Sequence, residues 1–317
     1  MFAKRQLVSP APSSAEIDHG IELAKSGDFA GALQILWPAA EQGDQKAQNS
    51  LGVMYARGRG VPQDAVAAVS WYRKAAEQGD SVAQYNLAYS YTHGFGVTES
   101  EDEALAWYLR SAEQGNHMAQ CMLGLAYSTG YASAAKDMVR AVSWFRKAAE
   151  QDNAGAQYWL GVLCQRGDGI AQDEVAALAW FHKSGNQGDV RALRYIGAAY
   201  EFGHGVAIDH AQAVHWYREA AERGCDVSQC WLADMYVQGK GAPRDPMQAA
   251  FWYRRSAEQG NAAAQHHLGV LYERGDGLAR DAAQAAAWYR RAADQGIAEA
   301  ERKLDALFNS CSTGVVH

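Results

Sequence analysis

Long apolar runs are missing from this sequence. Of its 317 residues 48% are apolar, but Arg, Glu, Gln or Asp recurs every few positions. No window therefore approaches the ~20 apolar residues that a membrane span requires. The segment Met1–Pro10 contains Lys4 and Arg5 but no apolar stretch of signal-peptide length. We expect no membrane insertion and a cytoplasmic protein, or a periplasmic one if the start is truncated.

Cysteine is scarce and irregularly placed. The five cysteines are an odd number, and they occupy unrelated positions in the repeat described below: Cys121, Cys164, Cys225, Cys230 and Cys311. This argues against a disulfide framework and for reduced thiols. The ten histidines include no His-Glu-x-x-His, and no Cys-x-x-Cys occurs. We therefore predict no metal site and no cofactor.

An excess of positive charge is also absent. The chain has 29 basic and 36 acidic residues, and its formal net charge of −7 is spread along its length. A nucleic-acid binder would present a concentrated basic surface. We therefore expect no nucleic acid among the partners and favour proteins with a basic or neutral surface.

Self-similarity is what the sequence has in abundance. Ala-Glu-Gln-Gly-Asp at 76–80 returns as Ala-Glu-Gln-Gly-Asn at 112–116 and 257–261. A tryptophan recurs at steps of 36 residues, with one residue inserted in the third repeat: Trp71, Trp107, Trp144, Trp180, Trp216, Trp252 and Trp288. A fixed period of this length is typical of solenoids. The sequence therefore contains seven repeats.

Each repeat has the pattern of two helices. In the first half, Ala47, Leu51 and Tyr55 stand at four-residue spacing and share one helical face. The second half begins at a polar capping residue such as Asp64. It ends at a glycine such as Gly79, where a helix needs a left-handed residue.

A pair of glycines separates the two helices, as Gly58 and Gly60 do in the first repeat. Two glycines allow the sharp reversal of a helical hairpin. One hairpin cannot bury both its leucine face and its tryptophan, so each hairpin must stack on the next. The predicted fold is an all-α, right-handed superhelical solenoid of antiparallel two-helix (αα-hairpin) repeats.

The consensus also resembles a known family. It reads Ala-Gln-x-x-Leu-Gly-x-x-Tyr-x-x-Gly-x-Gly, a capping Asp, and Ala-x-x-Trp-Tyr-Arg-Lys-Ala-Ala-Glu-Gln-Gly. This strongly resembles the Sel-one-like repeat (SLR) family of the tetratricopeptide-like helical repeat superfamily, over residues 44–299. The expected organisation is a flexible tail (1–13), a degenerate capping helix pair (14–43), seven repeats (44–297), a C-terminal capping helix (298–309) and a tail (310–317). Such a chain is expected to be a monomer.

The resemblance implies that the first helices line a concave groove. At about 100° per residue, the positions two before, two after and five after the buried leucine point away from the packed face. They differ between repeats, as a surface shaped for one partner would, although unconstrained drift would also vary them. An apolar strip and a mixed, acidic stretch give the predicted partner-binding residues: Tyr85, Tyr89, Leu125, Tyr158, Val162, Arg194, Glu201, Asp234 and Glu273.

These observations favour a non-enzymatic scaffold or adaptor that binds a protein partner in the groove. The resemblance also implies a possible role as an inhibitor or immunity protein for a secreted toxin or enzyme. Ser133-Ala-Ala-Lys136 matches the Ser-x-x-Lys of β-lactam-binding hydrolases, but no Ser-Asp-Asn or Lys-Thr-Gly follows it. We therefore predict no catalytic residue, and keep a hydrolase-like activity and a purely structural spacer as the alternatives.

Overall fold

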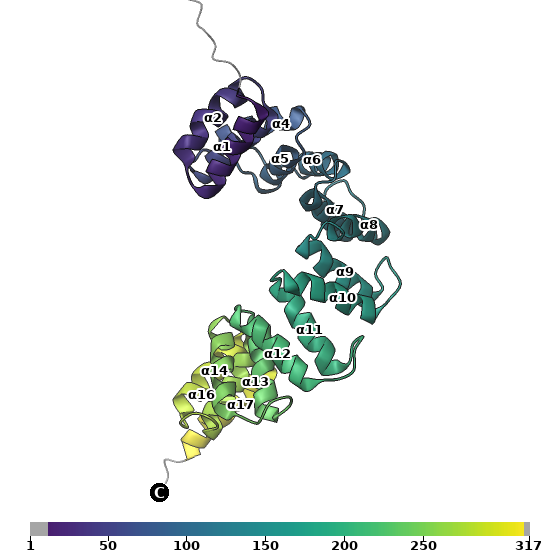
Figure 1. The fold of residues 1–317 in the computed structure, drawn as a ribbon. Coiled ribbons are helices and arrows are strands. Elements are labelled where there is room, and N and C mark those ends of the chain that lie inside the picture. The colour runs from purple at the N-terminus through teal and green to yellow at the C-terminus, as the bar shows by residue number, and fades with distance from the viewer. Residues whose placement is uncertain (1–11, 314–317) are drawn as a thin grey trace, which may run out of the picture. The chain divides into compact units, whose positions relative to one another are not determined.

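The computed structural model describes residues 12–313, and these residues form helices and loops without a strand (Figure 1). The seventeen helices are α1 (Ser14–Ser26), α2 (Phe29–Glu41), α3 (Gln45–Arg57), α4 (Ala65–Glu77), α5 (Ser81–His93), α6 (Glu101–Glu113), α7 (His117–Thr129), α8 (Met138–Ala149), α9 (Ala154–Arg166), α10 (Glu174–Asn186), α11 (Val190–Phe202), α12 (His210–Glu222), α13 (Asp226–Gln238), α14 (Pro246–Glu258), α15 (Ala262–Arg274), α16 (Ala282–Asp294) and α17 (Ala298–Thr313). The all-α prediction is confirmed.

Helices that follow one another in the chain pack together. Each odd-numbered helix from α3 to α15 is the first helix of a repeat, and the next even-numbered helix is the second. Within the repeats α3 packs on α4 and α5 on α6, and between them α4 packs on α5. The predicted solenoid of helical hairpins is therefore confirmed, whereas the handedness of its superhelix stays a prediction.

The chain divides into two compact units. The first contains residues up to Ala156 together with Asp168–Ile170, and the second contains Gln157–Gly167 together with the residues from Ala171 onward. Each unit has its own buried clusters. Leu51 and Leu87 are completely buried in the first unit, and Leu232 and Leu268 in the second.

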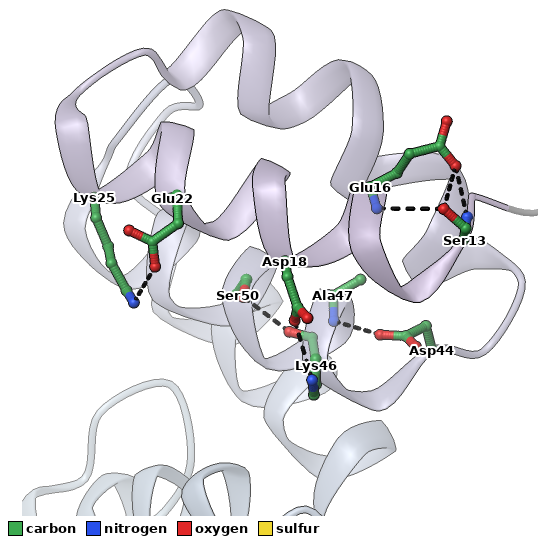
Figure 2. A network of polar contacts seen from close by, with 9 residues as sticks. All are labelled: Ser13, Glu16, Asp18, Glu22, Lys25, Asp44, Lys46, Ala47 and Ser50. Carbon is green, nitrogen blue, oxygen red and sulfur yellow. Dashed lines mark hydrogen bonds and ion pairs between the residues drawn. The ribbon is translucent and has the colours of Figure 1, made fainter.

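A polar network ties α1 to the first repeat (Figure 2). Ser13 and Glu16 form a reciprocal capping box at the start of α1. Lys46 of α3 donates to the Asp18 carboxylate of α1 at 3.0 Å. The first two helices thus occupy residues 14–41, ahead of the first repeat.

The C-terminal helix is longer than predicted. We expected it to end at residue 309, but α17 continues to Thr313. Nothing in residues 298–313 stops a helix early, because this segment contains neither proline nor glycine. Residues 1–11 and 314–317 of the two predicted tails lie outside the described part of the chain.

The second helix of each repeat lays one aromatic ring against a small residue of the first helix. A Cβ on Gly197 would lie 2.5 Å from the Tyr217 ring, so the glycine permits this close approach. Alanine holds the same position in the second and sixth repeats, as Ala88 and Ala233. The ring position is occupied in turn by Tyr72, Tyr108, Phe145, Phe181, Tyr217, Tyr253 and Tyr289.

The second glycine of the interhelical loop adopts a left-handed backbone conformation and lies close to the backbone of the preceding repeat, as Gly241 shows. Gly241 has a φ of 71°, and a Cβ there would lie 2.0 Å from the carbonyl oxygen of His210, at the start of the preceding repeat's second helix. In the third repeat Ala132 takes this place with a φ of 55°. The predicted difference in that loop is confirmed, since the inserted residue lengthens it.

A ladder of buried glutamines joins successive hairpins. Gln265 donates to the Ala257 carbonyl oxygen at 3.1 Å and accepts from Gln295 at 2.8 Å. Five further pairs have the same glutamine-to-glutamine bond: Gln48–Gln78, Gln84–Gln114, Gln120–Gln151, Gln157–Gln187 and Gln229–Gln259. The fifth repeat has Leu193 and Arg223 instead. Leu193 fits because Gly185, which it contacts, has no Cβ.

Replacing Gln265 with leucine should lower the free energy of unfolding by about 2–4 kcal/mol, because the buried Ala257 carbonyl and the Gln295 amide would both lose a partner. Chemical denaturation measures this loss. The added variant Ala257→Gly recreates the glycine that Leu193 contacts, Gly185 of the fourth repeat, and should recover part of this loss. A single variant as stable as the parent would show that the ladder does not contribute to stability.

Candidate functional site: an aromatic pocket

The first unit contains a pocket of about 540 Å³ between its first and second repeats. We call it the aromatic pocket. It includes two residues that the sequence predicted to face a partner, Tyr85 and Tyr89. Its walls come from α3, α4, α5, α7 and two loops: Ala56, Arg57, Gln63, Ala65, Ala68, Tyr72, Tyr85, Asn86, Tyr89, Ser90, Phe95 and Met118.

The rings of the aromatic pocket are partly open to solvent. Tyr89 is 42% exposed and Phe95 is 53% exposed. The Tyr89 ring lies 6.5 Å from that of Tyr85 and 6.1 Å from that of Phe95. Exposed aromatic side chains that line a concavity are typical anchors for a protein partner.

Three polar residues of the pocket are Tyr72, Arg57 and Asn86, and its walls also contain Gln63 and Ser90. Burial raises the pKa of Tyr72 to about 12, although the nearby Arg57 guanidinium opposes the shift. Tyr72 therefore stays protonated at neutral pH and can donate a hydrogen bond. Arg57 is exposed and forms no ion pair within residues 12–313. Asn86 donates to Asn49 at 2.9 Å, which leaves its second amide hydrogen available.

Two residues of the predicted apolar strip are not on the surface. Tyr158 is 7% exposed and Val162 is 2% exposed, so the prediction that they face a partner is wrong. The Tyr158 ring packs within the second unit, 6.1 Å from Phe181 and 5.8 Å from Tyr195. Leu125 of the first unit is half-buried and lies outside the aromatic pocket.

The acidic residues predicted in the distal repeats are engaged by tyrosines. Glu201 accepts from the Tyr217 hydroxyl at 2.7 Å. Asp234 accepts from Tyr253 in the same way at 2.5 Å. Arg194, which precedes both in the sequence, lies over aromatic rings, 5.1 Å from that of Tyr195 and 5.9 Å from that of Trp231.

Glu273 is held by two donors. It accepts from Tyr289 at 2.6 Å and from Lys303 at 3.1 Å. Burial would raise the pKa of Glu273, but the hydrogen bonds from Tyr289 and Lys303, together with the charges of Lys303 and Arg274, hold it below its usual value. Glu273 therefore remains a carboxylate, and its half-buried charge is already compensated within the chain.

The Ser-x-x-Lys match lies in a loop. Ser133 and Lys136 are exposed, and α8 begins only at Met138. The Ser133 backbone N–H donates to the Asp102 carboxylate at 3.1 Å. The serine of β-lactam-binding hydrolases opens a helix, so this placement does not reproduce the geometry that the motif requires.

Residues 12–313 contain no group of three or more histidine, cysteine or acidic side chains that could hold a metal ion. None of their helices is both long enough and apolar enough to cross a bilayer.

Sequence reasoning missed most of the aromatic pocket, including Arg57, Tyr72, Phe95 and Met118. Tyr72 is largely buried. Phe95 had a signal that could have found it. The residue between the paired glycines is polar or charged in the other repeats that keep both glycines, as Arg59 and Lys240 show, whereas the second repeat has phenylalanine.

Comparisons with known proteins agree with the repeat pattern. A family model for the Sel1 repeat matches seven successive segments: residues 45–80, 81–116, 117–153, 154–189, 190–225, 226–261 and 262–297. A search of curated proteins gave no significant match.

Solved structures resemble the chain as well. The protective antigen c5321 of uropathogenic Escherichia coli, which displays an SLR fold, is 36% identical with a TM-score of 0.83, over 95% of this chain and 65% of c5321. The chain thus spans less than two thirds of that protein. A Sel1 repeat protein from Oxalobacter formigenes is 31% identical with a TM-score of 0.71, over 97% of this chain and 91% of its own. The immunity protein Pa5087 from Pseudomonas aeruginosa is 18% identical with a TM-score of 0.42, over 68% of this chain and 81% of its own.

Proposed function

Because the chain belongs to the Sel1 repeat family, whose members are generally non-catalytic protein-binding scaffolds, we propose that it is a scaffold for a protein partner. In this proposal the partner contributes an extended segment, and a large apolar side chain of that segment enters the aromatic pocket. The same anchor would serve an adaptor and an inhibitor.

The observation that carries the proposal is the exposure of the Tyr89 and Phe95 rings in the wall of the aromatic pocket. Exposed apolar surface that is concentrated in a concavity costs solvation free energy in the unbound protein, and a partner that covers it recovers this cost. A purely structural spacer has no use for such a pocket.

Selection of short random peptides displayed against the intact chain tests the proposal. We expect the parent protein to enrich peptides with a large apolar side chain. The variant Tyr89→Ala/Phe95→Ala should lose this enrichment, because hot-spot aromatic side chains each contribute about 2 kcal/mol or more to binding.

Phe202 provides a matched control. It is 58% exposed, close to the exposure of Phe95, but lies at the end of α11 in the second unit. The variant Phe202→Ala should enrich the same peptides as the parent. If the parent and the double variant enrich the same peptides, the aromatic pocket is not the binding site and the proposal is wrong.

A further inference from the structure

The second-helix tyrosines differ in what their hydroxyls contact. Three of the five donate to a carboxylate of their own repeat, as Tyr289 does to Glu273. Tyr108 accepts from Thr92 at 3.3 Å. Tyr72 is the exception, because no residue of the described chain forms a hydrogen bond with its hydroxyl. The residue that corresponds to Glu273 in the first repeat is Ala56, which has no polar side chain.

The seventh repeat shows which groups surround the carboxylate where one is present. Glu273 accepts from Tyr289 and from Lys303 of α17. The charge of Arg274, which follows Glu273 directly in the chain, favours the ionised carboxylate. One carboxylate is thus held by a phenol, an amine and a nearby guanidinium.

The first repeat has a donor residue at each of the same three positions but lacks the carboxylate. Tyr72 corresponds to Tyr289, Arg57 to Arg274 and Asn86 to Lys303, and all three line the aromatic pocket. Each is a hydrogen-bond donor, and Arg57 carries a positive charge. The pocket therefore presents three donors around the place that a glutamate fills in the seventh repeat.

We propose that the aromatic pocket binds a glutamate side chain of the partner segment, whose carboxylate accepts from Tyr72, Asn86 and Arg57. The neighbouring apolar side chain of the segment then rests on Tyr89 and Phe95. This inference rests on the proposed function and adds the chemistry of the partner: an extended, acidic and apolar segment. A glutamate side chain within the segment, not a chain terminus, is the occupant, because the group that fills the equivalent place in the seventh repeat is a glutamate side chain.

The test uses random peptides displayed within a loop, so that they have no free carboxyl terminus, against the intact chain. The parent should enrich glutamate beside a large apolar residue. Tyr72→Phe removes only the hydroxyl and creates the residue type found at Phe145 and Phe181. Ala56→Glu supplies the carboxylate from within the chain. Both variants should keep the apolar preference and lose the preference for glutamate.

Affinities of the best enriched peptide and of its Glu→Gln form give the size of the effect. For the parent, the Glu→Gln peptide should bind about tenfold more weakly, as expected for the loss of a charge-assisted hydrogen bond. For Ala56→Glu the two peptides should bind alike. Arg57 is exposed, so Arg57→Gln leaves the core unchanged, and this variant should also reduce the difference in affinity between the two peptides. Tyr289→Phe, in the second unit, should leave that difference unchanged.

The outcomes separate this inference from the proposed function. Enrichment of apolar residues without glutamate would overturn the inference and leave the scaffold proposal standing. Enrichment that does not depend on Tyr89 and Phe95 would overturn both. A preference for acid that appears only with peptides bearing a free carboxyl terminus would overturn the inference in favour of terminus recognition.

Discussion

Replacement of Gly241 with alanine is expected to lower the free energy of unfolding of the second unit by about 3 kcal/mol or more. The left-handed backbone at this residue costs a side-chain-bearing residue about 1–2 kcal/mol. The new Cβ would also lie 2.0 Å from the His210 carbonyl oxygen. That oxygen belongs to the backbone of α12 and cannot rotate away, so the contact between consecutive repeats must open.

A substitution at Gly224 separates the cost of the left-handed backbone from the cost of the close contact with His210. Its φ is 94°, but no atom lies within 4 Å of where its Cβ would stand. Gly224→Ala should therefore cost only the backbone term, about 1–2 kcal/mol. Urea denaturation of both variants measures the difference. Equal losses for Gly241→Ala and Gly224→Ala would show that the approach to His210 is not a tight contact in solution.

Stability is expected to fall steeply above pH 10. Burial raises the pKa of five second-helix tyrosines above the ordinary value of 10.0: Tyr72, Tyr108, Tyr217, Tyr253 and Tyr289. Above pH 10 the unfolded chain loses these protons while the folded chain keeps them. The unfolded state then binds fewer protons, so the free energy of unfolding decreases as pH rises.

The expected size follows from the number of tyrosines. Each contributes about 1.4 kcal/mol per pH unit between its unfolded and folded pKa, so the three of the second unit together contribute about 4 kcal/mol per pH unit. Urea midpoints on either side of pH 10 test this. Tyr217→Phe keeps the ring and should reduce the slope by about a third. A midpoint that does not change through this range would contradict the burial of these hydroxyls.

Much of the fold follows from local patterns in the sequence. The paired glycines, the capping aspartates and the four-residue spacing of Ala47 and Leu51 each specify a local conformation, and they recur in register. A nearest-neighbour stack needs little else, because each hairpin contacts mainly the hairpins beside it. The helix pairs therefore appear where the period places them.

The candidate site was harder to predict, because it depends on contacts between repeats. A helical wheel places Tyr158 on the outward face, but the Phe181 and Tyr195 rings of the folded chain cover it. The wheel also cannot show that Phe95 and Met118, from a loop and from the third repeat, reach the same pocket as Tyr89. Tyr85 and Tyr89 do line the pocket, whereas their role in binding a partner stays a prediction.

The glutamine ladder shows a different limit. The glutamine of Ala-Gln-x-x-Leu-Gly is visible in the consensus, and so is the glutamine of Ala-Glu-Gln-Gly. Their hydrogen bond joins residues 30 positions apart, as in Gln265 and Gln295. Two positions that recur within a period do not by themselves reveal that they touch, since glutamine is also a common residue on protein surfaces.

A calorimetric titration tests the central claim most directly. The peptide that the parent enriches most is titrated into the intact chain, into Tyr89→Ala/Phe95→Ala and into the control Phe202→Ala. We predict the same affinity for the parent and the control, and at least about a thirtyfold loss for the double variant, which corresponds to about 2 kcal/mol. The same affinity for all three proteins would contradict a partner-binding role for the aromatic pocket.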